Sequence, residues 1–347
     1  TPIKSSAASD VYKRQVYNSE AYLNDLLSSL VNQKMQDIEI ILIDDASLDC
    51  SRDIMQSWEK KYPDKIRVFY NDANLGQGAS RNIGLKYAEG EYVSFVDSDD
   101  FIHPDMYFDM YNDALLNGMP NIVTSRIVFA KEDATYQDYF KTNRRKGVLV
   151  DLKKEPYTII YESPSCGNKL FKRSFIKNSS FLVDTMWEDA TFTYSHMFLA
   201  EKIVVSHNPD YYYRKHQNTG VSAQGFRVNT HLMDIFKVAT EIENKCIKNG
   251  CYDYFKEEIK VTQVASCLYR IREVLTWNID HNLKMDLIRD LYRLVQAKYG
   301  DINELNQDYL SMKVDFHTLD VVRQVRSDIL VEQAEENIQR TLSLLKV

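Results

Sequence analysis

The stretch that decides the fold is residues 91–100, which read Glu-Tyr-Val-Ser-Phe-Val-Asp-Ser-Asp-Asp. Residues 92–96 are mostly apolar or aromatic and have the length of a buried strand, and three carboxylates follow where that strand must end. Carboxylates crowded in this way repel one another, which favours a divalent cation among them. Because open α/β sheets bind ligands at the carboxyl ends of strands, the pattern predicts a metal that carries a phosphorylated substrate. An isolated Asp-x-Asp is otherwise a polar loop.

Strand and helix signals alternate on both sides of this stretch. Short apolar runs at residues 38–43, 66–70 and 121–129 predict further strands, and segments with helical spacing lie between them. Such alternation predicts an α/β fold, with a mostly parallel, Rossmann-like sheet flanked by helices. Beyond about residue 229 the strand signals fade, and the helical spacing that remains predicts an α-helical C-terminal domain.

We therefore expect three parts: a leader at residues 1–15, an α/β domain at 16–225 and a helical domain at 226–347. The leader is rich in Ser and Ala and has neither strand alternation nor the apolar core of a signal peptide. Its residues 5–15 resemble a translated sequencing adapter, so we expect the leader to be disordered or non-native. A foreign leader would leave the sheet without its first strand and would expose the edges of the neighbouring strands.

Composition excludes several classes of protein. The formal net charge of −7 argues against a nucleic-acid partner, which usually requires a basic surplus. Five cysteines without a Cys-x-x-Cys pair indicate neither a disulfide framework nor a zinc site, which fits a cytoplasmic protein. No apolar run approaches the roughly 20 residues of a membrane span.

Two features leave a peripheral contact with the inner face of the plasma membrane open. The basic cluster at residues 141–146 is either solvated or contacts an anionic acceptor or lipid head group. The apolar stripe of residues 319–345 either packs within the helical domain or docks on a membrane or a second subunit.

Seven short fragments, in this order and at the usual intervals, resemble the glycosyltransferase family 2 pattern on a GT-A fold. The resemblance covers about residues 16–220, and the helical tail resembles those of bacterial enzymes that build exopolysaccharide, capsule or teichoic-acid glycans. Each fragment is a weak signal alone, whereas the ordered set is specific. The fragments are Val16-Tyr17-Asn18, Ile43-Asp44-Asp45-Ala46-Ser47, Asn74-Leu75-Gly76, Ala79-Ser80-Arg81-Asn82-x-Gly84, Asp97-Ser98-Asp99-Asp100, Asn168-Lys169-Leu170 and Glu188-Asp189.

The resemblance implies how a nucleotide-sugar donor is held. Tyr17 matches the aromatic residue beside the nucleobase and is the candidate for stacking on it. Asp45 inherits the place near the uracil or ribose, and Arg81 matches the arginine that reaches the donor. Asp44 is either a second donor contact or a structural carboxylate at the end of its strand.

The resemblance also implies a Mn²⁺ or Mg²⁺ site. Asp99 matches the residue that coordinates the cation, and Asp97 contacts either the cation or the ribose. Asp100 supports its neighbours or caps a helix. Downstream, His216 completes the metal shell or is an ordinary solvated histidine, and Arg214 is the candidate for neutralising phosphate. The cation offsets charge on the departing nucleoside diphosphate.

Asp189 matches the family's general base. It would take a proton from the acceptor hydroxyl as that oxygen attacks the anomeric carbon, which gives displacement with inversion. An acid at this position is otherwise a partner of a helix dipole. The sequence therefore predicts an inverting glycosyltransferase that moves a sugar, with UDP as the expected nucleotide, to a hydroxyl of a cell-surface glycan or lipid-linked acceptor. The alternative is a non-catalytic nucleotide- or carbohydrate-binding module that keeps the fold.

Overall fold

The computed structural model describes residues 9–13, 16–130, 136–138, 147–214, 231–325 and 330–345. The chain divides into two compact units. The first unit consists of Thr1–Glu155 and Ser163–Lys215, and the second of Pro156–Glu162 and His216–Val347. The predicted domain boundary at residue 225 and the basic cluster at 141–146 lie outside the described residues.

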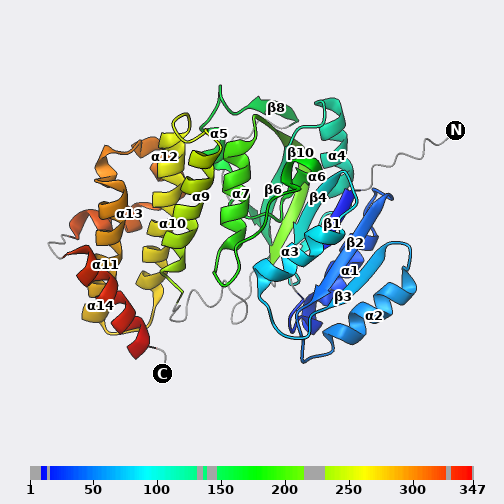
Figure 1. Cartoon of the computed structure of the whole chain (residues 1–347), viewed down its shortest axis with the longest axis horizontal. Coiled ribbons are helices and arrows are strands. Elements are labelled where there is room, and N and C mark those ends of the chain that lie inside the picture. Colours follow the sequence, from blue (N-terminus) through cyan, green and yellow to red (C-terminus); the bar gives the residue numbers. More distant parts are fainter. Residues whose placement is uncertain are drawn as a thin grey trace. The chain divides into compact units, whose positions relative to one another are not determined.

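The first unit is built on a 10-stranded sheet with the order β3-β2-β1-β4-β9-β6-β10-β5, in which β7 also pairs with β6 and β8 with β10 (Figure 1). The pairs within β3-β2-β1-β4 and the β6–β10 pair are parallel, as predicted. Every antiparallel pair includes one of the short strands β5, β7, β8 and β9. The strands are β1 (Ser9–Lys13), β2 (Ile38–Asp44), β3 (Ile66–Tyr70), β4 (Tyr92–Val96), β5 (Phe101–Ile102), β6 (Ile122–Ala130), β7 (Tyr136–Asp138), β8 (Val148–Asp151), β9 (Lys169–Lys172) and β10 (Lys202–Arg214).

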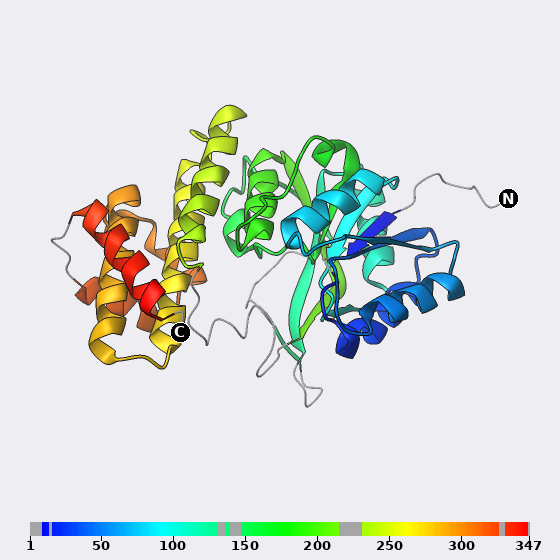
Figure 2. The ribbon, with the colours of Figure 1, turned by 60° about the horizontal axis from the view of Figure 1, so that its bottom comes forward.

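Helices cover both faces of this sheet (Figure 2). On one face, α4 packs on β6 and β10, and the apolar sides of α1 and α4 belong to one buried cluster with residues of β2 and β4, in which Leu27 and Met110 are fully inaccessible. The second face carries an aromatic cluster in which Phe95 of β4 contacts Phe181 and Phe192 at ring distances of 5.0 and 5.8 Å. The helices of this unit are α1 (Glu20–Val31), α2 (Ser51–Lys61), α3 (Gln77–Tyr87), α4 (Met106–Leu116), α6 (Arg173–Ile176) and α7 (Glu188–Leu199).

The leader differs from the prediction where the structure describes it. Residues 9–13 form β1, which lies between β2 and β4 and pairs in parallel with both. Residues 9–13 are therefore ordered and supply the first strand of the sheet, whereas the alternative that the leader is non-native stays a prediction. The physical reason is that strand pairing uses backbone N–H and C=O groups, which any non-proline sequence supplies. A segment without strand alternation can therefore still fill a gap between two strand edges.

The second unit is helical, as predicted. The long helix α10 contacts α5, α9, α11, α12 and α13 and has a mostly buried surface. The apolar stripe predicted over residues 319–345 is divided between two helices, and its members Leu319, Val322, Ile338 and Leu342 are buried. No helix in the described part of the chain is long and apolar enough to cross a membrane. The helices are α5 (Thr158–Tyr161), α9 (Asp234–Lys248), α10 (Lys256–Thr276), α11 (His281–Tyr299), η1 (Ile302–Glu304), α12 (Gln307–Lys313), α13 (Phe316–Gln324) and α14 (Val331–Leu344).

Gly78 in the first turn of α3 permits a close approach of two backbones. A Cβ at this position would overlap the carbonyl oxygen of Leu182. Gly→Ala within a helix normally stabilises by about 0.5–1 kcal/mol, but relieving a backbone overlap costs about 1–3 kcal/mol. We therefore expect Gly78→Ala to lower the thermal unfolding midpoint. Lys86→Ala, at an exposed position of the same helix, is the control and should leave the midpoint nearly unchanged; an unchanged or higher midpoint for Gly78→Ala would contradict the close contact.

Candidate functional site

The predicted site begins at one edge of the sheet. Strands β1, β2 and β4 are adjacent and parallel, so their carboxyl ends meet there. The segments that follow them are hydrogen-bonded to one another. The Ser19 hydroxyl donates to the Ser98 hydroxyl at 2.8 Å, and the Asn18 amide donates to the Ser47 hydroxyl at 3.2 Å. Tyr17, in the first of these segments, is 40% exposed, so its ring is accessible to a ligand.

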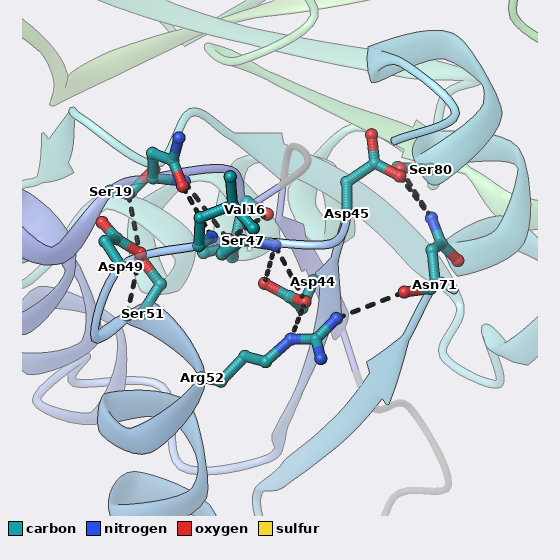
Figure 3. Close-up of polar contacts among 12 residues, drawn as sticks. Val16, Ser19, Asp44, Asp45, Ser47, Asp49, Ser51, Arg52, Asn71 and Ser80 are labelled. Atoms are coloured by element: carbon teal, nitrogen blue, oxygen red, sulfur yellow. Dashed lines mark hydrogen bonds and ion pairs between the residues drawn. The ribbon is translucent and has the colours of Figure 1, made fainter. Parts of the chain in front are cut away.

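Asp44 is a structural carboxylate at the end of β2. It is fully buried, and Arg52 donates to it through Nε at 2.6 Å. The Ser47 amide also donates to both of its oxygens at 3.3 Å (Figure 3). Of the two roles left open by the sequence, these contacts favour the structural one.

Asp45 points to the other side of the loop in Figure 3 and holds the segment that leads into α3. Its carboxylate accepts from Asn71 Nδ2 at 2.6 Å and from the amides of Leu75 and Gly76 at 2.9 Å each. Asp45 is fully buried. These oxygens bind the protein's own N–H groups and fix the start of α3. The donor contact expected of Asp45 stays a prediction.

Arg81 lies on α3 and joins two other parts of the site. Its guanidinium forms an ion pair with Glu188 Oε1 and lies 3.6 Å, through Nη2, from Asp97 Oδ1. It also lies over the ring of Phe181 at 5.1 Å, and the side chain is 1% exposed. These contacts tie the end of β4 to the start of α7, through a glutamate to which the sequence assigned no role. The donor contact expected of Arg81 stays a prediction.

Asp189 is the second residue of α7. Its Oδ1 accepts from the Ala190 amide at 2.9 Å, and the residue is partly exposed. The preceding Trp187 has a left-handed backbone with φ of +60°. The strained residue before the helix sets the direction in which the chain enters α7, and thereby the position of this carboxylate.

The buried thiol of Cys166 is influenced by four charged side chains of the site, those of Arg81, Asp97, Glu188 and Asp189. Burial raises the pKa of Cys166 to about 12; Arg81 opposes the shift, whereas Asp189, Asp97 and Glu188 act in the same direction as burial. The structure thus brings the predicted base and the first acid of the Asp-Ser-Asp-Asp loop into one electrostatic neighbourhood.

Tyr211 of β10, which the sequence did not single out, supports that acidic loop. The Asp97 amide donates to the Tyr211 hydroxyl at 3.0 Å, and this hydroxyl donates to Asp100 Oδ2 at 2.6 Å. Burial raises the pKa of Asp100 well above its usual range, and Asp99 and Asp97 act in the same direction. Asp100 therefore supports its neighbours, in agreement with its expected role.

Arg214, at the end of β10, holds the same loop from another side. Its Nε donates to the Asp99 carbonyl at 2.9 Å, and its Nη2 lies 3.1 Å from Asp25. The guanidinium also lies over the rings of Tyr22 and Phe101, at 5.1 and 5.2 Å. The sequence thus identified a residue that contacts the acidic loop, whereas His216 lies outside the described residues.

Replacing Tyr211 by phenylalanine should loosen the acidic loop. The change removes one acceptor and one donor from a buried network, and leaving buried partners unsatisfied costs about 1–3 kcal/mol. We expect a lower free energy of unfolding in a urea titration. Tyr213→Phe, two residues further along β10, is the control, and equal losses in the two variants would contradict a specific role for the Tyr211 hydroxyl.

The acidic loop fits a cation that also binds substrate. Among the described residues, no group of three or more His, Cys, Asp or Glu side chains is arranged to hold a metal ion. The loop offers the carboxylates of Asp97, whose side chain is 12% exposed, and Asp99, which is partly exposed. Mg²⁺ takes one or two protein carboxylates together with substrate phosphates, so this pair of oxygen ligands suits such an ion.

Comparisons with known proteins identify the domain that carries this site. The profile of "Glycosyl transferase family 2" matches residues 15–179. This segment is a family 2 glycosyl transferase domain. The family 2 segment contains β2, α3 and the acidic loop, whereas Asp189 and Arg214 lie beyond it.

Relatives of the family 2 domain include bacterial proteins named for glycosyl transfer and for teichoic acid biosynthesis. The chain is 36% identical over 203 residues to the poly(ribitol-phosphate) beta-glucosyltransferase of Bacillus spizizenii, a match that covers 57% of this chain and 31% of that protein. The chain spans between 31% and 59% of the length of three curated relatives.

Solved structures confirm the GT-A fold. The S. aureus TarS 1–349 structure with UDP-GlcNAc has a TM-score of 0.59 and 22% identity, and the match covers 92% of this chain and 93% of that one. The mannosyltransferase PcManGT from Pyrobaculum calidifontis, solved with GDP-Man and Mn²⁺, has a TM-score of 0.51 and 13% identity, with 91% and 86% covered. The predicted α/β fold with a helical C-terminal part is thus confirmed.

Proposed function

We propose that this chain is an inverting glycosyltransferase that moves a sugar from a UDP-sugar to a hydroxyl of a bacterial cell-envelope glycan. The observation that carries the proposal is the buried link through Arg81, which joins Asp97 of the acidic loop to Glu188, the neighbour of Asp189. In a family 2 domain, this link positions a donor-binding loop against a candidate base. The acceptor is a teichoic acid or related polysaccharide, free or lipid-linked.

The chemistry assigned to the chain needs one proton acceptor. In our proposal Asp189 takes the proton from the acceptor hydroxyl, the hydroxyl oxygen bonds to the anomeric carbon, and the bond from that carbon to the UDP oxygen breaks. The electron pair of the broken bond leaves with UDP. The attack occurs opposite the departing group, so the anomeric configuration inverts. Tyr17 stacks on the uracil, which orients the donor for this attack.

A cation would be held by Asp99 and Asp97, with His216 as a further ligand. When bound, Mn²⁺ or Mg²⁺ offsets the negative charge that develops on the diphosphate. The loop is kept in place for this role by Tyr211 and Arg214, which hydrogen-bond Asp100 and the Asp99 carbonyl. The solved relative that contains GDP-Man and Mn²⁺ supports this choice of ion.

The choice of donor and acceptor follows the relatives. TarS was solved with UDP-GlcNAc, and the Bacillus relative is named for transfer of glucose to poly(ribitol phosphate). These names support UDP-GlcNAc or UDP-glucose as the donor and a polyol-phosphate polymer or similar glycan as the acceptor.

Ligand-dependent stability tests this proposal. A ligand that binds only the folded state stabilises it by about 2.7 kcal/mol at a hundred times its dissociation constant. We expect UDP with Mn²⁺ to raise the thermal unfolding midpoint of the wild type, and EDTA to remove much of that rise. Asp99→Asn should lose the Mn²⁺-dependent part, whereas Asp64→Asn, at an exposed position before β3, should keep it.

Two results would overturn the proposal. Equal stabilisation of wild type and Asp99→Asn would reject the assigned metal site. Stabilisation by UDP and Mn²⁺ without any sugar transfer, tested with UDP-glucose and UDP-GlcNAc and a teichoic-acid acceptor, would favour a non-catalytic nucleotide-binding module.

A further inference from the structure

A cavity lies in the first unit, and its lining residues are outside the proposed donor site. Its volume is about 350 Å³, and its lining residues come from β6, β7 and β10. Pockets of about 300–1,000 Å³ accommodate small ligands. The lining residues are Arg126, Val128, Tyr136, Asp210 and Tyr212.

The strand register explains why these side chains share one face of the sheet. Asp210 pairs with Arg126, and Tyr212 pairs with Val128, between the parallel strands β10 and β6. Tyr136 of β7 pairs with the residue two positions beyond Val128. Paired residues, and residues two apart in a strand, point to the same face. The pocket is therefore a feature of the sheet itself, with Val128 buried as part of its lining.

The polar part of the pocket is an ion pair without net charge. Arg126 donates to Asp210 through Nε at 2.6 Å and through Nη2 at 2.8 Å, the geometry of a two-pronged guanidinium–carboxylate pair. The Arg126 side chain is 46% exposed. A pair of this kind presents donors and acceptors side by side, which suits hydroxyl groups. It lacks the positive surplus that a phosphate would require.

The apolar part of the pocket is aromatic. The rings of Tyr136 and Tyr212 lie 5.1 Å apart and are tilted by 47°, and Tyr136 is 57% exposed. Phe101 of β5 stacks on Tyr212 at 4.8 Å and restrains that ring. Burial raises the pKa of Tyr212, with Asp210 acting in the same direction, so its hydroxyl keeps its proton at neutral pH. Aromatic faces with a polar rim complement the C–H faces and hydroxyls of a sugar ring.

We propose that this pocket binds an uncharged sugar substituent carried by the acceptor glycan, rather than its polyol-phosphate units, outside the residues that handle the donor. That the sugar belongs to the acceptor rests on the proposed function; the binding itself does not. The pocket adjoins the proposed site, because Arg214 lies two residues after Tyr212 on β10 and Phe101 contacts the side chains of both. A glycan held here would be kept near the acidic loop.

Saturation-transfer NMR and calorimetry with defined probes test the pocket. The probes are methyl β-glucoside, N-acetylglucosamine and ribitol phosphate, each added to the full chain without donor. We expect the two neutral sugars to bind wild type, and Tyr136→Ala to weaken that binding about tenfold. Asp210→Asn should weaken it as well, because it removes the charge of the ion pair. Tyr254→Ala, which removes a tyrosine that is 54% exposed in the second unit, is the matched control and should bind as wild type does.

Three outcomes would overturn the inference: neither neutral sugar binds wild type, ribitol phosphate alone binds, or Tyr136→Ala binds like wild type. The stabilisation by UDP and Mn²⁺, measured on the same samples, keeps the two proposals separate. If the neutral sugars do not bind but UDP and Mn²⁺ still stabilise the protein, only the proposal for the pocket is rejected. Sugar binding without donor stabilisation rejects the proposed function and leaves the pocket standing.

Discussion

Replacing Asp189 by asparagine is expected to lower the rate of sugar transfer by about 10²- to 10⁴-fold, the usual contribution of a positioned general base. Asparagine keeps an oxygen that can accept from the Ala190 amide, as Asp189 Oδ1 does at 2.9 Å, so the start of α7 should be preserved. The variant loses only the capacity to take a proton. Initial rates at saturating UDP-sugar measure the effect.

Asp184→Asn is the control for this experiment. Asp184 is exposed and has a left-handed backbone with φ of +53°, a conformation that asparagine adopts readily. It precedes α7 in the same segment, so the two substitutions remove the same charge from nearby positions. Stabilisation by UDP and Mn²⁺ should be retained in both variants. Similar transfer rates in both would contradict the assignment of the base to Asp189.

The strand β4 was predictable because its sequence signal is local. Residues 92–96 form β4 over the predicted bounds, and the acidic loop follows it as expected. The apolar run that predicts a buried strand and the carboxylates that follow the run are adjacent in the sequence, so neighbouring residues are enough to predict both features. The GT-A fold was predictable because the ordered fragments resemble the family pattern; four of them lie at or just after the ends of the strands β1 to β4, whereas the others lie on α3, at the start of β9 and at the start of α7.

The supporting contacts of the site were not predictable, because their partners are distant in the chain. Tyr211 and Asp100 lie 111 residues apart, and Arg81 and Glu188 lie 107 apart. A sequence shows that an arginine is present on α3, but the fold decides whether it faces a ligand or a buried carboxylate. The strand β1 escaped prediction for a different reason, because backbone pairing leaves no pattern in the side chains.

Replacing Arg81 is expected to lower the stability of the first unit strongly. Arg81→Met leaves the buried carboxylates of Glu188 and Asp97 without their cation, and breaking a buried pair in this way costs about 3–5 kcal/mol. We expect a correspondingly lower free energy of unfolding in a urea titration. Lys86→Met, an exposed position of the same helix, is the control and should change stability little.

A second variant distinguishes the two roles that Arg81 can have. When both members of a buried pair become uncharged, the desolvation cost of the remaining charge disappears. Arg81→Met with Glu188→Gln should therefore recover much of the stability that Arg81→Met alone loses. If Arg81 instead contacts the donor, as the family resemblance implies, Arg81→Met would weaken UDP binding while stability stays near wild type, and Glu188→Gln would restore nothing. Stability that falls and is then rescued identifies Arg81 as the positioning residue that connects the acidic loop to α7.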